Sequence, residues 1–195
     1  MEPIILASGS IRRHEFFRLL GLPFSIMPSH VKEELVPGLT PREQAEAIAR
    51  SKVAESLKLI ADGNPPWILA ADTIVSIDEE IFGKPIDREH AKLMLYRLSG
   101  REHEVITALA LYNGKRKTID CRSNISLVRF CVLSKVEIEW YLDSGEWQGV
   151  AGSYRLQGIG GCFISEIKGS CSSIVGLPLH EFYVMLRENG YDYSV

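Results

Sequence analysis

The run from Trp67 to Ala71, followed by Asp72, constrains the fold of this chain more than any other stretch. The run is nearly all apolar and has the length of a strand, which is the pattern of a strand buried on both faces. Such a strand needs a layer of structure on each side of its sheet. The chain has 195 residues, enough for one domain or for two small lobes that share one core.

Predicted helices and strands alternate around this run. Strands are expected at 3–7, 22–27, 73–77, 81–82, 105–112, 119–131 and 162–167. Helices are expected at 11–20, 87–98, 136–142 and 178–188, with a longer one that begins at Thr40-Pro41 and is closed by residues 63–66. This alternation predicts an α/β fold whose mixed, partly antiparallel sheet is flanked by helices, in a single domain over residues 1–195.

Local signals set the expected ends of these elements. Ser10, Thr40 and Asp87 are expected to cap helix N-termini, and Gly21 is expected to end the first helix. Turns are expected at 78–80 and at 113–114, and residues 151–161 form a glycine-rich segment. The apolar face of the long helix is expected to consist of Ala45, Ile48, Ala49, Val53, Ala54 and Leu57.

Composition excludes several classes of protein. The formal net charge is −3 and the pI is about 6.0, so the chain has no basic field to collect nucleic acid or an anionic membrane. No apolar stretch is long enough for a membrane span, and the first 30 residues lack a signal-peptide pattern. The four cysteines show no metal-site spacing, so we expect them to be reduced and mostly buried, in a cytoplasmic protein.

The first strand-to-helix turn carries an unusual set of side chains, namely Ser8, Ser10, Arg12 and Arg13. A helix N-terminus has partial positive charge, so two arginines in the first turn are unfavourable unless something negative lies in front of them. Hydroxyls, backbone amides and two guanidinium groups together form a cradle for a triphosphate. The alternative is a capping serine with both arginines turned to solvent.

Acidic residues form a second candidate group. Asp72, directly after a doubly buried strand, would lie at the edge of the sheet where α/β proteins bind ligands, with Thr73 adding a hydrogen bond. Such an aspartate can hold a divalent cation or orient a water molecule, and Glu33 or Glu34 can supply further oxygen ligands. The alternatives are a turn-capping aspartate and a solvated glutamate pair.

Three further residues are candidates for binding. Lys84 is held between Gly83 and Pro85, and Lys52 lies near the apolar stripe of the long helix. Gln157 lies in the glycine-rich segment and offers the donor and acceptor needed to read a base edge. Surface lysines and a structural turn are the alternatives. The phosphate-binding P-loop and the dinucleotide fingerprint are absent, and nothing supports a covalent nucleophile.

Several motifs, in order along the chain, resemble the Maf family of nucleoside triphosphate pyrophosphatases, once described as septum-formation inhibitors. They are Leu6–Arg13, Ala71-Asp72-Thr73, Gly83-Lys84-Pro85, Leu98-Ser99-Gly100 with His103, Gln157-Gly158 and Val175–Leu179. The resemblance covers about residues 4 to 186. It implies two lobes with an active-site crevice between them, and a homodimer as the family's habit.

The resemblance also implies a reaction and roles for residues. The reaction is hydrolysis of the α–β phosphoanhydride of a nucleoside triphosphate, with Mg²⁺ or Mn²⁺, to give a nucleoside monophosphate and pyrophosphate. Asp72 matches the proton acceptor, and Glu33 matches an acidic residue linked to the metal. The phosphate-binding positions of the family match Ser8, Arg12, Arg13, Lys52 and Lys84. Arg12, Thr73 and Gln157 match positions associated with substrate choice in the branch that acts on dTTP and UTP.

The chain departs from the family pattern at three positions. Ile11 replaces the usual proline, Val150 replaces a lysine, and Arg155 replaces a glycine next to the base-reading position. The local charge is preserved if Arg155 reaches the crevice. These changes motivate an alternative function, a catalytically weak nucleotide-binding regulator of cell division. A nucleic-acid binder is disfavoured by the acidic balance.

Overall fold

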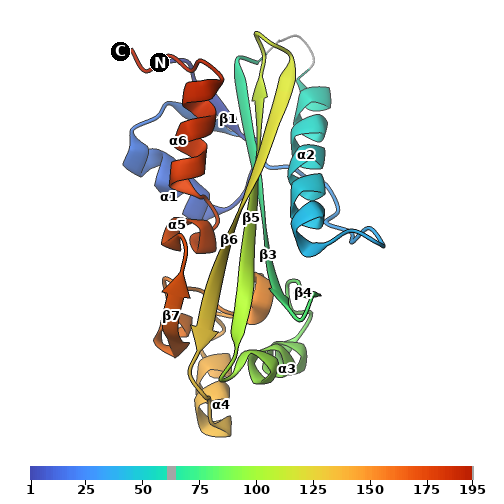
Figure 1. The fold of residues 1–195 in the computed structure, drawn as a ribbon, viewed down its shortest axis with the longest axis vertical. Coiled ribbons are helices and arrows are strands. Elements are labelled where there is room, and N and C mark those ends of the chain that lie inside the picture. The colour runs from blue at the N-terminus through green and yellow to red at the C-terminus, as the bar shows by residue number, and fades with distance from the viewer. Residues whose placement is uncertain (61–64, 195) are drawn as a thin grey trace. The chain divides into compact units, whose positions relative to one another are not determined.

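The computed structural model describes residues 1–60 and 65–194, and its centre is a seven-stranded sheet. The strand order is β2-β1-β3-β5-β6-β7, with β4 paired to β3 (Figure 1). The strands are β1 (Ile4–Leu6), β2 (Phe24–Ile26), β3 (Trp67–Ile77), β4 (Glu80–Phe82), β5 (Glu102–Asn113), β6 (Thr118–Phe130) and β7 (Ile164–Lys168). Strand β1 runs parallel to β2 and β3, whereas β4 and β7 pair antiparallel. The predicted α/β class and mixed sheet are confirmed.

The helices begin and end largely where the capping signals place them. They are α1 (Ile11–Leu20), α2 (Pro41–Leu59), α3 (Arg88–Leu98), α4 (Lys135–Asp143), α5 (Cys171–Val175) and α6 (Leu179–Glu188). Thr40 forms a full capping box with Glu43, and Asp87 accepts a hydrogen bond from the His90 amide. Gly21 ends α1 in the left-handed conformation, with φ of 64°. The expected closure at 63–64 lies outside the described residues.

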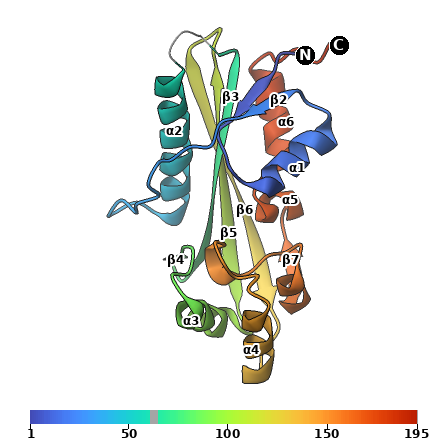
Figure 2. The ribbon, with the colours of Figure 1, turned by 180° about the vertical axis from the view of Figure 1, so that it is seen from behind.

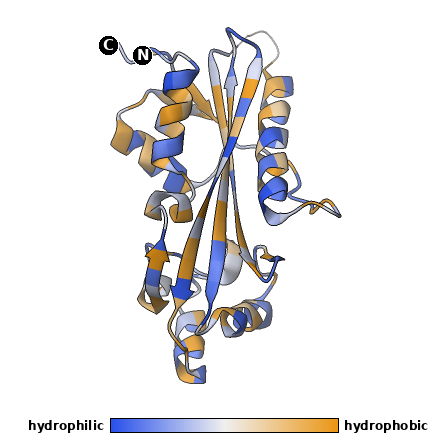
Figure 3. Cartoon of the chain, in the orientation of Figure 1, coloured by the Kyte–Doolittle hydropathy of each residue, from blue (hydrophilic) through white to orange (hydrophobic). Residues whose placement is uncertain are grey.

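The chain divides into two compact units. Unit 1 comprises residues 1–72, 107–124 and 176–195, and unit 2 comprises residues 73–106 and 125–175. In unit 1, α2 lies on one face of the sheet and α1 and α6 lie on the other (Figures 1 and 2). These helices carry both hydrophobic and hydrophilic residues, as expected for helices with one face on a sheet and one in solvent (Figure 3).

Each unit has its own hydrophobic core. In unit 1, Phe17 of α1 and Phe182 of α6 pack with their ring centroids 5.4 Å apart, against apolar residues of β1, β3 and β5. In unit 2, apolar residues of α3 and α4 pack with an aromatic group that includes Phe130, Tyr141 and Phe163. Both cores pack against β3, the strand that carries Asp72 and Thr73.

The structure corrects five sequence-based expectations. Ser10 is at the N-terminus of α1, but its side chain makes no capping hydrogen bond, and its backbone amide donates to Ser8 Oγ. Ala54 is exposed. Three of the four cysteines are exposed rather than buried, although all four are free thiols as predicted. Residues 162–163 belong to a 3₁₀ helix, η2 (Ile159–Phe163), so β7 begins two residues late. Helix α5 was not predicted.

The expectation for Asp72 also needs correction. The apolar run was expected to end as a strand at Ala71, but β3 continues to Ile77. Its parallel pairing with β1 ends at the Leu6–Leu69 pair, and its antiparallel pairing with β4 begins at Val75. Asp72 therefore lies inside a long strand, just beyond the carboxyl end of the parallel β1–β3 ladder.

No helix in the described part of the chain is long and apolar enough to cross a membrane.

Candidate active site

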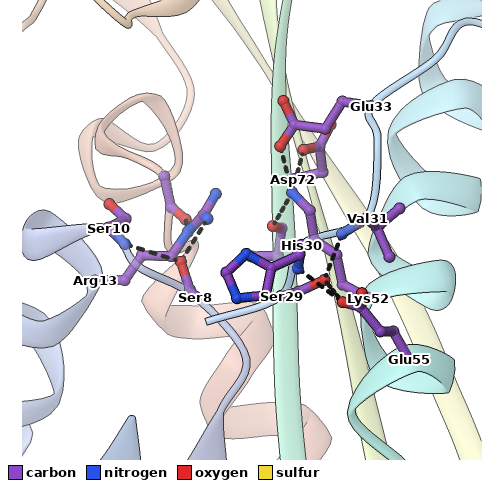
Figure 4. Close-up of polar contacts among 12 residues, drawn as sticks. Ser8, Ser10, Arg13, Ser29, His30, Val31, Glu33, Lys52, Glu55 and Asp72 are labelled. Atoms are coloured by element: carbon purple, nitrogen blue, oxygen red, sulfur yellow. Dashed lines mark hydrogen bonds and ion pairs between the residues drawn. The ribbon is translucent and has the colours of Figure 1, made fainter. Parts of the chain in front are cut away.

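The first group of site residues surrounds the turn from β1 to α1 in unit 1. The buried guanidinium of Arg13 donates from Nη1 to Ser8 Oγ at 3.1 Å and from Nε to the Gly176 carbonyl at 2.8 Å (Figure 4). Burial lowers the pKa of Arg13 to about 10, so the group is still a cation at neutral pH. His14 Nε2 lies 2.8 Å from the Ser8 carbonyl oxygen and holds the same turn. The structure thus brings a fixed cation and a hydroxyl to the start of α1.

Ser10 and Arg12 belong to the same turn. The Ser10 amide donates to Ser8 Oγ at 3.2 Å, which makes Ser8 the residue that organises the turn. Arg12 is half-buried at the second position of α1. The alternative in which both arginines turn to solvent is excluded for Arg13, which is buried.

The second group is an ionic cluster just beyond the carboxyl end of the parallel β1–β3 ladder. Lys52 Nζ of α2 lies 2.8 Å from Asp72 Oδ1 and 2.8 Å from Glu33 Oε1 (Figure 4). Lys52 and Asp72 are only 8% and 6% exposed, while the Glu33 side chain is 35% exposed. Lys52 therefore joins the two carboxylates that were predicted separately, and the cluster carries a net charge of −1.

The structure also distinguishes between the two adjacent glutamates. Glu33 points to Lys52, whereas the Glu34 side chain is exposed and lies 4.0 Å from Lys32. Glu33 is therefore the glutamate that belongs to the cluster. It lies in the segment between β2 and α2 rather than directly after a strand.

The donor set of this cluster fits a divalent cation that is shared with a substrate. Two carboxylates reach one cationic nitrogen, and Mg²⁺ is usually held by one or two carboxylates together with phosphate oxygens and water. Within residues 1–60 and 65–194, no three His, Cys, Asp or Glu residues are arranged to hold a metal by themselves. A cation held by Asp72 and Glu33 would thus depend on oxygen atoms from a ligand to complete its coordination.

The remaining predicted residues, Thr73, Lys84 and Gln157, belong to unit 2. Thr73 follows Asp72 in β3 and is half-buried. Lys84 is exposed, in the segment after β4, and the preceding Gly83 carbonyl accepts a hydrogen bond from the Gly152 amide at 3.2 Å. Because Gly152 is in the glycine-rich segment, the structure ties the segment of Lys84 to the segment that leads to Gln157.

The loop of Gln157 is held by a residue that the sequence did not reveal. The Glu146 carboxylate accepts hydrogen bonds from the Ile159 amide at 2.8 Å and the Gly160 amide at 3.1 Å. A Cβ at Gly158 would meet that carboxylate, so any other residue there would have to displace the Glu146 side chain. Gln157 itself is exposed beside this clamp.

The positions that depart from the Maf pattern have simple local environments. Val150 is buried in unit 2, so an apolar side chain packs where the family pattern has a lysine. Arg155 Nη2 donates to the Gln148 carbonyl at 3.2 Å, so its guanidinium is bound to neighbouring backbone. The Arg155 guanidinium thus has a backbone partner within unit 2.

The fold and the site define an α/β protein that gathers a buried arginine, hydroxyls, a lysine and two carboxylates around the end of β1 and the middle of β3. The chain belongs to the Maf family, since the model of the Maf-like protein family matches residues 3–189. It is 41% identical over 191 residues to a protein of Symbiobacterium thermophilum named dTTP/UTP pyrophosphatase, an alignment that covers 98% of this chain and 96% of that protein.

Two further relatives carry the same name. The dTTP/UTP pyrophosphatase of Shewanella oneidensis is 42% identical over 192 residues, covering 96% of this chain and 98% of that protein. The dTTP/UTP pyrophosphatase of Ruminiclostridium cellulolyticum is 43% identical over 190 residues, covering 96% of each chain. The resemblance predicted from the motifs is thereby confirmed over nearly the whole chain.

Proposed function

We propose that this protein is a nucleoside triphosphate pyrophosphatase that hydrolyses the α–β phosphoanhydride of dTTP, UTP and related pyrimidine nucleotides. The observation that carries the proposal is the buried Lys52–Asp72–Glu33 cluster in a member of the Maf family. The names of the relatives support the choice of pyrimidine substrates. The products are a nucleoside monophosphate and pyrophosphate.

In the proposed reaction, Asp72 accepts a proton from the attacking water. Lys52 holds Oδ1 of Asp72, so Oδ2 is the atom that receives the proton. The water oxygen forms a bond to phosphorus while the bond from phosphorus to the α–β bridging oxygen breaks, and that oxygen leaves with one product. Fixing the carboxylate on a buried lysine removes the reorganisation that a mobile side chain would require.

The cations of unit 1 bind the phosphates in this proposal. Arg13, fixed by Ser8 and the Gly176 carbonyl, presents a charge that needs no rearrangement when the phosphate groups arrive. Ser8, Ser10, Arg12 and Lys52 complete the phosphate-binding set of unit 1, and the family resemblance assigns a phosphate-binding role to Lys84 as well. Thr73 and Gln157 are the proposed base-selecting residues, on the strength of the family resemblance.

A divalent cation, Mg²⁺ or Mn²⁺, is proposed as the cofactor, with Asp72 and Glu33 as its protein ligands. When bound, such an ion neutralises charge on the phosphates and on the leaving pyrophosphate. The carboxylates of Asp72 and Glu33, held together by Lys52, are the oxygen donors that this hard cation prefers.

A product assay tests the proposed function. The purified protein would be incubated with common and 5-methylated nucleoside triphosphates, with Mg²⁺ and then Mn²⁺, and pyrophosphate would be resolved from orthophosphate. We expect pyrophosphate, released fastest from dTTP or UTP. Tight nucleotide binding without turnover under either cation would favour the nucleotide-binding regulator instead.

The variant Asp72→Asn tests the role of the carboxylate. We expect turnover to fall by about 10²–10⁴-fold, the usual contribution of a general base. Asp78→Asn is the matched control, because Asp78 is an exposed turn residue that pairs with Arg101. Full activity of Asp72→Asn, with both variants folded by circular dichroism, would refute the assignment of Asp72.

A further inference from the structure

The position of Glu33 raises a structural question that the proposed reaction does not answer. Residues 27–40 all lie in the described part of the chain, and they form neither helix nor strand. Glu33, in the middle of this segment, is nevertheless held 2.8 Å from Lys52. An irregular segment loses considerable chain entropy when it is fixed, so other contacts must hold it in place. We call residues 29–36 the strap.

One end of the strap is held by Gln44 of α2. Gln44 Nε2 donates to the Glu34 carbonyl at 2.9 Å, and Gln44 Oε1 accepts from the Val36 amide at 2.9 Å. The residue is only 1% exposed, so a polar amide occupies a position on the buried face of α2. The side chain pairs with the strap as a neighbouring strand would, using both its donor and its acceptor.

The other end is held by Glu55 of the same helix. Glu55 Oε2 accepts from the Ser29 hydroxyl and, at 2.8 Å, from the His30 amide (Figure 4). Ser29 Oγ in turn accepts from the Val31 amide at 3.3 Å, which tightens the same turn. The Ser29 hydroxyl lowers the pKa of Glu55, so the carboxylate is ionised at neutral pH. Charge-assisted bonds of this kind are stronger than neutral ones.

The two contacts are placed so that they bracket the cluster. Gln44 and Glu55 are separated by about three turns of helix at 3.6 residues per turn, so they share one face of α2. Lys52 lies between them in the helix, and Glu33 lies between their contacts in the strap. The helix thus supplies both the lysine and the two side chains that hold the strap against it.

We propose that Gln44 and Glu55 are positioning residues that hold the strap on α2 and so place the Glu33 carboxylate beside Lys52 and Asp72. The role of Glu33 in the cluster rests on the proposed function, whereas the way in which Glu33 is held does not. Without these contacts, Glu33 would have to find the cluster from a mobile loop, at an entropic cost for each turnover.

Amide hydrogen exchange in the free protein tests whether Gln44 and Glu55 hold the strap. We expect Gln44→Met, which keeps the length of the side chain but removes its hydrogen bonds, to raise amide exchange at Val36 at least tenfold. Glu55→Gln and Ser29→Ala should do the same at His30 and Val31. Glu46→Gln is the matched control, since Glu46 lies on the same helix and accepts from the Ser123 hydroxyl at 2.7 Å, away from the strap. Unchanged exchange in all three strap variants would overturn the proposal.

A double-mutant cycle tests whether the contacts of Gln44 with the strap affect turnover through Glu33. Gln44→Met should lower turnover about tenfold and raise the Mn²⁺ concentration for half-maximal activity, and direct Mn²⁺ binding measured by electron paramagnetic resonance should weaken in parallel. In a Glu33→Gln background, Gln44→Met should change turnover less than twofold. If Gln44→Met lowered turnover as much in the Glu33→Gln background as in the wild type, the positioning role would be overturned. If the wild-type protein released no pyrophosphate, the proposed function would fail, while the exchange and Mn²⁺-binding results would still decide the positioning claim.

Discussion

Lys52 illustrates how a single residue defines the site. Moving an ammonium and two carboxylates out of water carries a desolvation penalty that their mutual attraction often fails to recover. Replacing such an ionic cluster as a whole by well-packed hydrophobic residues often leaves a fold equally stable, so stability alone does not account for Lys52, Asp72 and Glu33. Their retention is consistent with a site selected for binding and catalysis.

His103 is a buried histidine whose protonation affects the stability of the fold. It is 2% exposed in unit 2, its Nε2 lies 2.8 Å from the Tyr154 hydroxyl, and its ring packs edge-on against Phe130. Its Nδ1 makes no hydrogen bond with any described residue. Burial in this aromatic environment lowers the pKa of His103 to about 4.

The protonation of His103 should therefore make stability depend on pH. The unfolded chain, with an ordinary histidine pKa of about 6.5, binds the proton first as pH falls, so the stabilisation is full above about pH 6.5 and is lost between there and pH 4. From pH 7.5 to 5.5 we expect this residue alone to lower the free energy of unfolding by about 1 kcal/mol. Urea unfolding of the wild type and of His103→Gln at both pH values measures it, because the variant should lack that part of the slope. Equal slopes would contradict the prediction.

The turn of the β3–β4 hairpin can be tested by substitution. Asp78 and Glu79 form its two-residue turn with φ of 52° and 64°, a left-handed conformation that strongly favours glycine at the second position. Glu79→Gly should raise the free energy of unfolding by up to about 1 kcal/mol, because the left-handed strain of Glu79 is removed and Asp78 keeps its pair with Arg101.

Thermal unfolding of Glu79→Gly and of a control, Glu80→Gly, would measure this gain. Glu80 is already in β4 and pairs with Arg97, so glycine there should lower the melting temperature instead. A fall in melting temperature for Glu79→Gly would mean that the turn is not strained.

Elements with strong local signals were predictable from the sequence, and those set by tertiary pairing were not. Helices α2 and α3 begin next to Thr40 and Asp87 because these side chains cap them locally, whereas α1 begins after Ser10 without a side-chain cap. Both halves of β3 were predicted, as the apolar run at 67–71 and a strand at 73–77 paired with 81–82, but their continuity was missed because the polar Asp72 interrupts the apolar pattern.

The candidate site was predictable to a similar extent. Its residue types were visible in the motifs, but the joining of Glu33 and Asp72 by Lys52 depends on an irregular segment whose path no local pattern determines. Gln44 could have been found, because a glutamine spaced with Ala45, Ile48 and Lys52 on the buried face of α2 needs a polar partner. Glu146 and Glu55 gave no comparable signal, since both are partly exposed glutamates.

At the scale of the whole molecule, neither unit is a continuous stretch of chain. The chain passes from one unit to the other within β3, β5 and β6, and again at 175–176. Strands β3 and β5 therefore contribute residues to both cores, such as Leu69 and Val75 in β3. A strand that loses its packing in one core loses part of what orders it in the other, so we expect the two units to unfold in one transition.

This coupling can be measured with a fluorescence probe confined to unit 2. In a Trp67→Phe parent, the remaining tryptophans, Trp140 and Trp147, both belong to unit 2. Leu186→Ala then removes a fully buried side chain from the core of unit 1, at a cost of about 2–5 kcal/mol. If the units are coupled, the urea midpoint seen by the unit 2 tryptophans should fall by about 1 M or more, together with the circular dichroism of the whole chain. A midpoint that stays at the parent value while the circular dichroism splits into two steps would show that the units unfold independently, because the damage to unit 1 would then leave the core around Leu98 intact.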